Sequence, residues 1–343
     1  MNNTIDNVEI SDISSNSCSI SKNDYIHINL LKKYIDALTV NINDKHLHKH
    51  VNLIFDSGAV NGLMGIGAAM YINTLKHKGY IHVNKISGCS IGSIIAIWFI
   101  FDCPEKMYYY VSLLFSYYKK HNNFYIYHKI INNVIYELFS SDDMSIINNK
   151  LYINYYDTIK HINKVVTIFK NREHLIQCII RSSHVPFFTC NQYKIQDRYI
   201  DGITPYIFNN NDNNDNSEIE YKNIIVKLIN LHNPIKSINI KYESNIYTRI
   251  IRGIVETNDF FINDVNSICN IYNSNRLCYY VNYRIIINLF IRKYFILFFI
   301  FIFDLFISFH NNLPTCIKTS YIYNNIIFFI KKNINWFISH LNI

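Results

Sequence analysis

The sequence predicts an α/β fold built on a parallel sheet, followed by a helical C-terminal extension. An apolar strand at Val51–Phe55 leads through a glycine-broken loop into a helix that ends at Gly79. A second strand at Tyr80–Ser87 runs through Gly-Cys-Ser-Ile-Gly into an apolar helix that reaches about Phe101. Strand, loop, helix, strand, turn and helix in this order are typical of the opening of a parallel α/β sheet.

Periodicity and composition predict the elements around this opening. Apolar residues of Tyr25–Leu38 recur on one helix face, and the tyrosine-rich residues 104–150 are also predicted to be helical. Lys164–Phe169 is predicted as a strand, His174–Ser183 as a helix and Asn223–Asn230 as a late core strand.

The chain divides into segments of different character. The predicted division is a disordered N-terminal extension at 1–24, a helix and lead-in at 25–50, the main α/β domain at 51–208, a polar loop with the completing strand and helices at 209–265, and a hydrophobic helical region at 266–343.

Composition narrows the class of protein. Half of the 343 residues are hydrophobic and 17% are charged, which excludes a wholly disordered chain. The net charge of +8 suits an anionic partner such as a lipid surface or nucleic acid, and it equally suits a lysine-rich bias without function.

No metal site, cofactor or disulfide framework is indicated. The eight cysteines are scattered and none forms a C-x-x-C pair, so reduced thiols are expected. The polar stretch Asn209–Glu220 resembles a calcium loop, but Ser217 stands where glycine is required and Asn223 where the bidentate glutamate belongs. The polar N-terminus lacks the apolar core of a secretory signal. We expect the protein in the cytoplasm or on the cytoplasmic face of a membrane.

The pentapeptide Gly88-Cys89-Ser90-Ile91-Gly92 lies between a predicted strand and a predicted helix. In a nucleophile elbow of this pattern, the serine occupies a strained turn and small neighbours let strand and helix approach each other. Taken alone, the pentapeptide is better explained as an ordinary glycine turn.

Two further stretches bear on this elbow. Asp56–Gly62 links a strand to a helix, so its backbone N–H groups can face an oxyanion at a helix N-terminus. Asp201-Gly202 lies within Ser182–Phe208, although Asp-Gly by itself is a common turn dipeptide.

In order and spacing, these three stretches resemble the patatin-like phospholipase family, which has a glycine-rich oxyanion loop, a G-x-S-x-G elbow and an Asp-Gly-Gly/Ala motif. The resemblance covers roughly Val51 to Phe208. It implies a three-layer α/β/α sheet and a lipid acyl hydrolase, phospholipase A-like, which acts on carboxylic esters. It implies an acyl-lipid substrate and a membrane surface as partners, and no nucleic acid. The oligomeric state is not indicated.

The resemblance also assigns roles to residues. Ser90 is the expected nucleophile and Asp201 the expected proton acceptor of a Ser-Asp dyad that works through an acyl-enzyme. The other assigned positions are Ser57, Gly58, Ala59 and Gly62 for the oxyanion hole, Gly88 and Gly92 for the elbow, and Gly202 and Ile203 for the Asp-Gly motif.

The chain departs from the family pattern at four of its positions. Ser57 and Ala59 replace glycines of the oxyanion loop. Asn61 stands where a basic residue is common, and Ile203 stands where the family has glycine or alanine. These departures keep open the alternative of a catalytically inactive lipid-binding or membrane scaffold. Acyl transfer is a further alternative, because it uses the same residues and differs only in the acceptor.

Other nucleophiles and bases are weaker candidates. Cys89 neighbours Ser90, but a buried thiol is expected there. His184 or His232 could complete a triad, and Ser90, Asp201 and His232 follow the chain order of α/β-hydrolases. Fourteen histidines make such a match easy to obtain, so the dyad is favoured.

The C-terminal region suggests membrane attachment. Tyr294–Phe309 is almost continuously apolar but carries Asp304 and is slightly short for a full span. Extension back to Tyr283 gives sufficient length but encloses Arg292 and Lys293. The last 20 residues mix apolar residues with a lysine pair and a tryptophan, as interfacial helices do. A buried helix of an enlarged core is the alternative.

Overall fold

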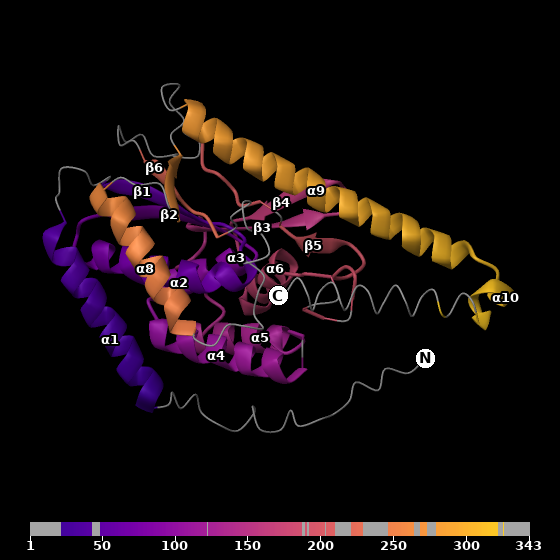
Figure 1. The fold of residues 1–343 in the computed structure, drawn as a ribbon, viewed down its shortest axis with the longest axis horizontal. Coiled ribbons are helices and arrows are strands. Elements are labelled where there is room, and N and C mark those ends of the chain that lie inside the picture. The colour runs from indigo at the N-terminus through magenta and orange to yellow at the C-terminus, as the bar shows by residue number, and fades with distance from the viewer. Residues whose placement is uncertain are drawn as a thin grey trace.

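A mixed β-sheet with helices on both faces forms the protein (Figure 1). The computed structural model describes residues 22–42, 49–121, 123–186, 189–190, 192–202, 204–209, 221–228, 246–263, 268–272, 279–321 and 325. This arrangement is the expected three-layer α/β/α fold with a helical C-terminal region. The predictions for residues 1–21, Ile203, residues 210–220 and His232 lie outside the described residues.

Seven strands form the sheet within the described residues, in the order β4-β3-β2-β1-β6-β7, with β5 also pairing with β3. Their bounds are β1 His50–Phe55, β2 His82–Cys89, β3 Leu151–Asp157, β4 Ile162–Val166, β5 Tyr199–Asp201, β6 Lys222–Val226 and β7 Cys269–Tyr272. The four strands β3, β2, β1 and β6 run parallel. The strands β4, β5 and β7 pair antiparallel, so the sheet is mixed around a parallel centre.

Helices cover the sheet and extend beyond it. Their bounds are α1 Lys22–Leu38, α2 Gly62–His77, α3 Ile91–Phe101, α4 Pro104–His121, α5 Tyr127–Leu138, α6 Arg172–Ser182, α8 Ile246–Asn263, α9 Tyr279–Asn312 and α10 Thr315–Lys318, with short 3-10 turns η2 at Thr39–Asn41 and η4 at Ala59–Asn61. The predicted helices before the first strand and before Ser183 correspond to α1 and α6.

Alternating side chains on the central strands supply the two sides of the core. Leu53 and Phe55 of β1 pack into the large cluster that contains α2 and α3. Ile54 points to the opposite face, where it clusters with Ile225 of β6 and Ile285 of α9. The helix α9 therefore covers the face of the sheet that α2 and α3 leave free (Figure 1).

The largest difference from the sequence prediction is strand β3. Residues 104–150 contain α4 and α5 and then a series of turns, and the next seven residues form a strand that the sequence analysis did not predict. Leu151, Ile153 and Tyr155 belong to the large core cluster, and their alternation in the sequence was the signal that could have identified the strand. The predicted strand at Lys164–Phe169 is β4, which begins two residues earlier and ends three residues earlier.

The strands β6 and β7 extend the sheet beyond residue 208, so residues after the predicted α/β domain contribute to the same sheet. The predicted domain boundaries themselves stay predictions. In the described part of the chain, no helix is both long enough and apolar enough to span a membrane.

Candidate active site

Ser90 occupies a strained turn between β2 and α3. Its φ and ψ are 56° and −129°, a region that non-glycine residues rarely adopt. A Cβ on Gly88 would lie 2.5 Å from the carbonyl oxygen of Gly92, and one on Gly92 would lie 2.3 Å from the carbonyl oxygen of Phe55. Both glycines are therefore required by close backbone approach, and the turn has the geometry of a nucleophile elbow.

Strand order brings Asp201 to this elbow. On one side of β3, the last residue of β2, Cys89, pairs with Asn154. Asp201 of β5 pairs with the next residue, Tyr155, whereas β4 occupies the other side of β3. The strand β5 thus continues along β3 where β2 ends, and this places Asp201 beside the turn that carries Ser90. The Cys89 Sγ atom lies 3.8 Å from Asp201 Oδ1, in agreement with this placement.

Ser182, which the sequence analysis did not single out, connects the two candidate residues. Its Oγ accepts a hydrogen bond from the Ser90 backbone N–H at 3.0 Å. Its carbonyl oxygen accepts one from the Gly202 N–H at 3.2 Å, and the His184 carbonyl accepts the Asp201 N–H at 3.2 Å. The end of α6 therefore fixes the elbow and the Asp-Gly turn relative to each other.

The loop at residues 56–62 lies against the same elbow. A Cβ on Gly62 would be 2.5 Å from Ile91 Cγ1, and one on Gly58 would be 2.1 Å from Leu228 Cβ. Within the described residues, the N–H groups of Gly58 and Ala59 donate no hydrogen bond, and they precede α2. Free N–H groups at a helix N-terminus are the donors that an oxyanion requires.

The two replaced glycines of this loop differ in consequence. The Ser57 N–H donates to Asp56 Oδ1 at 2.8 Å, so Ser57 supplies no free donor. Ala59 has a φ of 45°, where a side chain is strained, but its side chain is exposed. Asn61 is bonded on both sides, because its Nδ2 donates to the Leu228 carbonyl at 2.7 Å and its Oδ1 accepts from Arg249 of α8 at 2.6 Å. Asn61 therefore ties this loop to Leu228 and to α8.

His184 is fully buried and its ring nitrogens have other partners. Its Nδ1 lies 3.2 Å from Thr189 Oγ1, and its Nε2 lies 3.1 Å from the Tyr193 carbonyl oxygen. Burial lowers the pKa of His184 to about 4. A neutral histidine that is engaged in this way has a structural role.

Cys89 is fully buried, as expected. Burial raises the pKa of its thiol, and the Asp201 carboxylate raises it further. The thiol therefore stays protonated and is a poor nucleophile. Among the described residues, no group of three or more histidine, cysteine, aspartate or glutamate side chains is arranged to hold a metal ion.

Residues 53–212 match the family model described as patatin-like phospholipase. The chain contains a patatin-like phospholipase domain. The matched residues run from β1 through the elbow to the Asp-Gly turn, which are the parts that form the site described above. No curated protein matches the chain.

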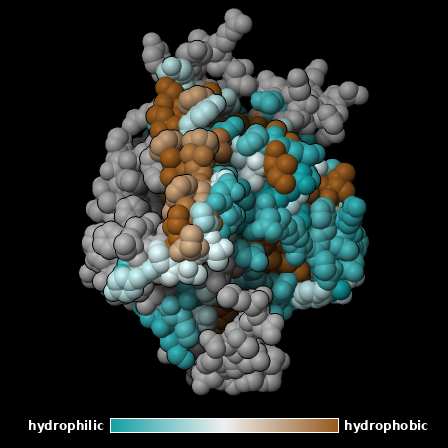
Figure 2. All heavy atoms as spheres, turned by 90° about the vertical axis from the view of Figure 1, so that its right-hand side faces the viewer, coloured by the Kyte–Doolittle hydropathy of each residue, from teal (hydrophilic) through white to brown (hydrophobic). Residues whose placement is uncertain are grey.

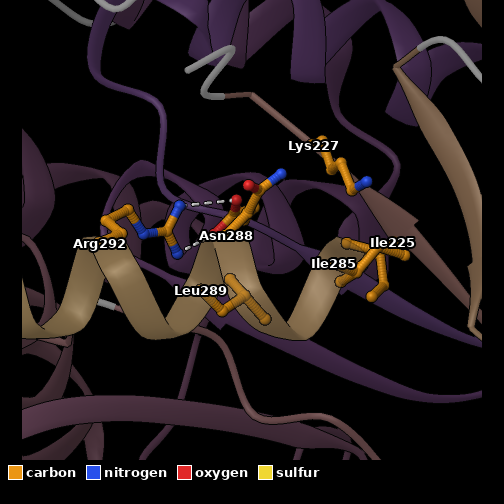
Figure 3. Close-up of a pocket in the computed structure, with 7 residues that line it drawn as sticks. Ile225, Lys227, Ile285, Asn288, Leu289 and Arg292 are labelled. Carbon is orange, nitrogen blue, oxygen red and sulfur yellow. Dashed lines mark hydrogen bonds and ion pairs between the residues drawn. The ribbon is translucent and has the colours of Figure 1, made fainter. Parts of the chain in front are cut away.

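The structure adds one residue to the neighbourhood of this patatin-like site. Arg292 of α9 forms a buried, two-pronged ion pair with Asp56, the first residue of the loop at 56–62 (Figure 3). The sequence analysis treated Arg292 only as an interruption of a membrane span. An arginine inside an apolar helix was the available signal, because such a charge needs a buried partner.

Proposed function

We propose that the protein is a lipid acyl hydrolase, phospholipase A-like, that uses Ser90 and Asp201 as a catalytic dyad. Membership of the domain in the patatin-like phospholipase family supports acyl-lipid hydrolysis at the level of the class. The observation that carries the residue assignment is the end-to-end placement of β2 and β5 along β3, which brings Asp201 to the strained elbow.

In the proposed reaction, Ser90 Oγ attacks the ester carbonyl while Asp201 accepts the hydroxyl proton. The N–H groups of Gly58 and Ala59 stabilise the oxyanion, and a donor of this kind contributes about 3–4 kcal/mol to the transition state. The ester bond breaks, the alcohol leaves with the proton from Asp201, and an acyl-enzyme remains. Water then attacks the acyl-enzyme, Asp201 accepts its proton, and the fatty acid is released as Ser90 regains its hydrogen.

A cavity on the side of the sheet that α9 covers provides space for substrate. It has a volume of about 340 Å³ and lies between α9 and the segment that follows Gly202. Its lining includes Asn154, the strand partner of Cys89, and the side chains of Thr204, Tyr206, Leu289 and Phe290. This volume lies within the ordinary range for small-molecule pockets, and the mostly apolar lining suits an acyl chain.

We further propose that α9 attaches the protein to a lipid surface. Most of its exposed side chains are apolar, and they form a band in Figure 2. The exposed members are Ile286, Phe290, Ile291, Tyr294, Phe298, Phe301, Ile302, Leu305, Phe306 and Phe309. The net charge of +8 favours an anionic bilayer, and an apolar helix face beside the substrate cavity suits an interfacial helix.

Active-site labelling tests the dyad. A fluorophosphonate probe should label the wild-type protein at Ser90, and Ser90→Ala should remove both labelling and release of fatty acid from phosphatidylcholine. Asp201→Asn should lower kcat by about 10²- to 10⁴-fold, because an amide orients the hydroxyl but cannot accept its proton. Lipid mass spectrometry identifies the product.

Two control variants and two possible outcomes for the wild type separate the alternatives. Asp197→Asn changes an exposed aspartate of the same segment and should keep wild-type activity. Cys89→Ala should keep labelling if Ser90 is the nucleophile. A folded wild-type protein that neither reacts with the probe nor hydrolyses lipid would favour the inactive scaffold, and an acylated lipid as the only product would favour acyl transfer.

A further inference from the structure

A buried ion pair joins α9 to the start of the oxyanion loop. Arg292 Nη2 lies 2.7 Å from Asp56 Oδ1, and Arg292 Nη1 lies 2.8 Å from Asp56 Oδ2. The side chains are only 9% and 5% exposed, respectively. Figure 3 shows Arg292 reaching from the helix, with both guanidinium contacts dashed. This is the fork-to-fork geometry in which an arginine fixes both oxygens of a carboxylate.

Asp56 transmits this constraint to the loop. Its backbone N–H donates to the Val226 carbonyl oxygen at 3.1 Å, which anchors it at the end of β6. Its Oδ1, which also accepts from Arg292, accepts the Ser57 N–H at 2.8 Å. The peptide that enters the loop is thereby held one residue before the free N–H groups of Gly58 and Ala59.

Stability alone does not account for such a pair. Transfer of both charges out of water is costly, and apolar side chains of similar size often stabilise a protein as well as a buried pair does. Burial lowers the pKa of Arg292, but the neighbouring acidic groups, Asp56 foremost, together outweigh burial and the net pKa is raised. Cys89 and Asp201 contribute in the same direction, so the guanidinium charge lies within electrostatic reach of the elbow.

We propose that Arg292 is a positioning residue of the active site. Through Asp56 it holds the oxyanion loop in the conformation in which the Gly58 and Ala59 N–H groups face the reacting carbonyl. The inference rests on the proposed hydrolase function and adds one residue to its machinery. That residue belongs to α9, which lies outside the residues 53–212 that match the family model.

Substitutions at both ends of the pair test this role. Arg292→Gln removes the charge, Arg292→Lys keeps the charge without the fork, and Asp56→Asn removes the acceptor. Lys194→Gln is the matched control, because the Lys194–Asp304 pair at 2.8 Å is a second ion pair between α9 and the body of the protein. Kinetics on a soluble p-nitrophenyl ester exclude effects on lipid binding.

We expect Arg292→Gln and Asp56→Asn to lower kcat by at least about 10-fold with KM within about twofold, since loss of one oxyanion donor costs 10²- to 10³-fold. The kcat of Arg292→Lys should lie between those of these two variants and that of the wild type. The kcat of Lys194→Gln should equal that of the wild type. In a variant that combines Arg292→Gln with Asp56→Asn, the second substitution should lower kcat little further, because both residues act through one loop. A merely structural role would not separate kcat from KM in this way.

Hydrogen exchange at the Ser57 amide, which donates to Asp56 Oδ1, provides a readout that does not depend on activity. It should be faster in Arg292→Gln than in the wild type or in Lys194→Gln. Unchanged kcat and exchange, a gain of activity, or equal losses in Arg292→Gln and Lys194→Gln would each overturn the inference. If Arg292→Gln does not fold, Arg292→Lys decides the question, and wild-type kinetics in that variant would contradict the proposal. An inactive wild type with the expected exchange pattern would instead contradict the hydrolase function.

Discussion

At the scale of the residue, the site concentrates backbone strain. Ser90 and Ala59 both have positive φ angles, and a glycine at either position would relieve the backbone strain. Strain of about 1–3 kcal/mol at such positions persists only where the surroundings determine the conformation. Here the surroundings are the contacts of Gly88 and Gly92 and the hydrogen bonds of Ser182. The serine hydroxyl is thereby held at the end of the sheet.

His184 permits a test at the same scale, through pH. Its folded-state pKa of about 4 is below the ordinary value of 6.5, so the unfolded state binds more protons between these values. Stability should therefore be lost as the pH falls from 6.5 towards 4, with a slope of up to about 1.4 kcal/mol per pH unit from this residue. His184→Gln should reduce the slope of urea-unfolding free energy against pH by that amount.

The substitution also lowers the free energy of unfolding through lost packing. This loss is measured at pH 8 and subtracted, so that only the slopes against pH are compared. His128, whose pKa burial also lowers, leaves a residual slope in the variant. A slope that is the same with and without His184 would show that this histidine is not buried in its neutral form.

At the scale of the element, helices α2 and α8 pack by direct backbone contact. A Cβ on Gly67 of α2 would lie 2.0 Å from the Ile250 carbonyl oxygen, and one on Gly253 of α8 would lie 2.0 Å from the Met64 carbonyl oxygen. The small residues on the early turns of α2 therefore serve the approach of another helix. This approach also brings Arg249 of α8 to Asn61 at the oxyanion loop.

Gly67→Ala should consequently destabilise the protein by about 3 kcal/mol, the upper end of what overpacking usually costs. Gly79→Ala is the matched control, because its added Cβ meets nothing within 4 Å and only the φ of 76° opposes it, at about 1–2 kcal/mol. Chemical denaturation measures both variants. Equal losses at the two positions would contradict close packing of α2 against α8.

At the scale of the whole molecule, α9 has two faces with different partners. Inward side chains contact the sheet face and the site, among them Ile285, Arg292 and Ile300. The outward band is apolar, and the C-terminal part of the helix projects past the body of the protein (Figure 1). A lipid surface that binds this band would therefore lie next to the helix that positions the oxyanion loop.

Vesicle binding tests this arrangement. Replacement of Phe298, Phe301, Leu305 and Phe309 by serine should weaken co-sedimentation with phosphatidylcholine–phosphatidylserine vesicles by more than about 100-fold, because each buried apolar side chain contributes about 1.5–3 kcal/mol. Activity on a soluble ester should be unchanged. Four exposed apolar residues of α1, namely Tyr25, Ile26, Leu30 and Tyr34, provide the matched control when they are replaced in the same way. Binding that survives the α9 substitutions would contradict a role for this face.

The sequence by itself determined the features that depend on local pattern. Glycine spacing and a strand–turn–helix hydrophobic pattern predicted the turn at Ser90 and the loop before α2, because these conformations depend on small residues at fixed offsets. The order of three such stretches, rather than any one of them, favoured a nucleophile elbow over an ordinary glycine turn. The family and the three-layer fold followed from their order.

The tertiary structure alone decided the pairings between distant segments. It revealed β3 as an interior strand between β2 and β4, in a stretch to which the sequence analysis assigned no element. It also revealed the pair of Asp56 and Arg292, which are 236 residues apart in the chain. Local periodicity determines which face of an element is buried, but the partner of a buried charge depends on how the whole sheet and α9 pack together.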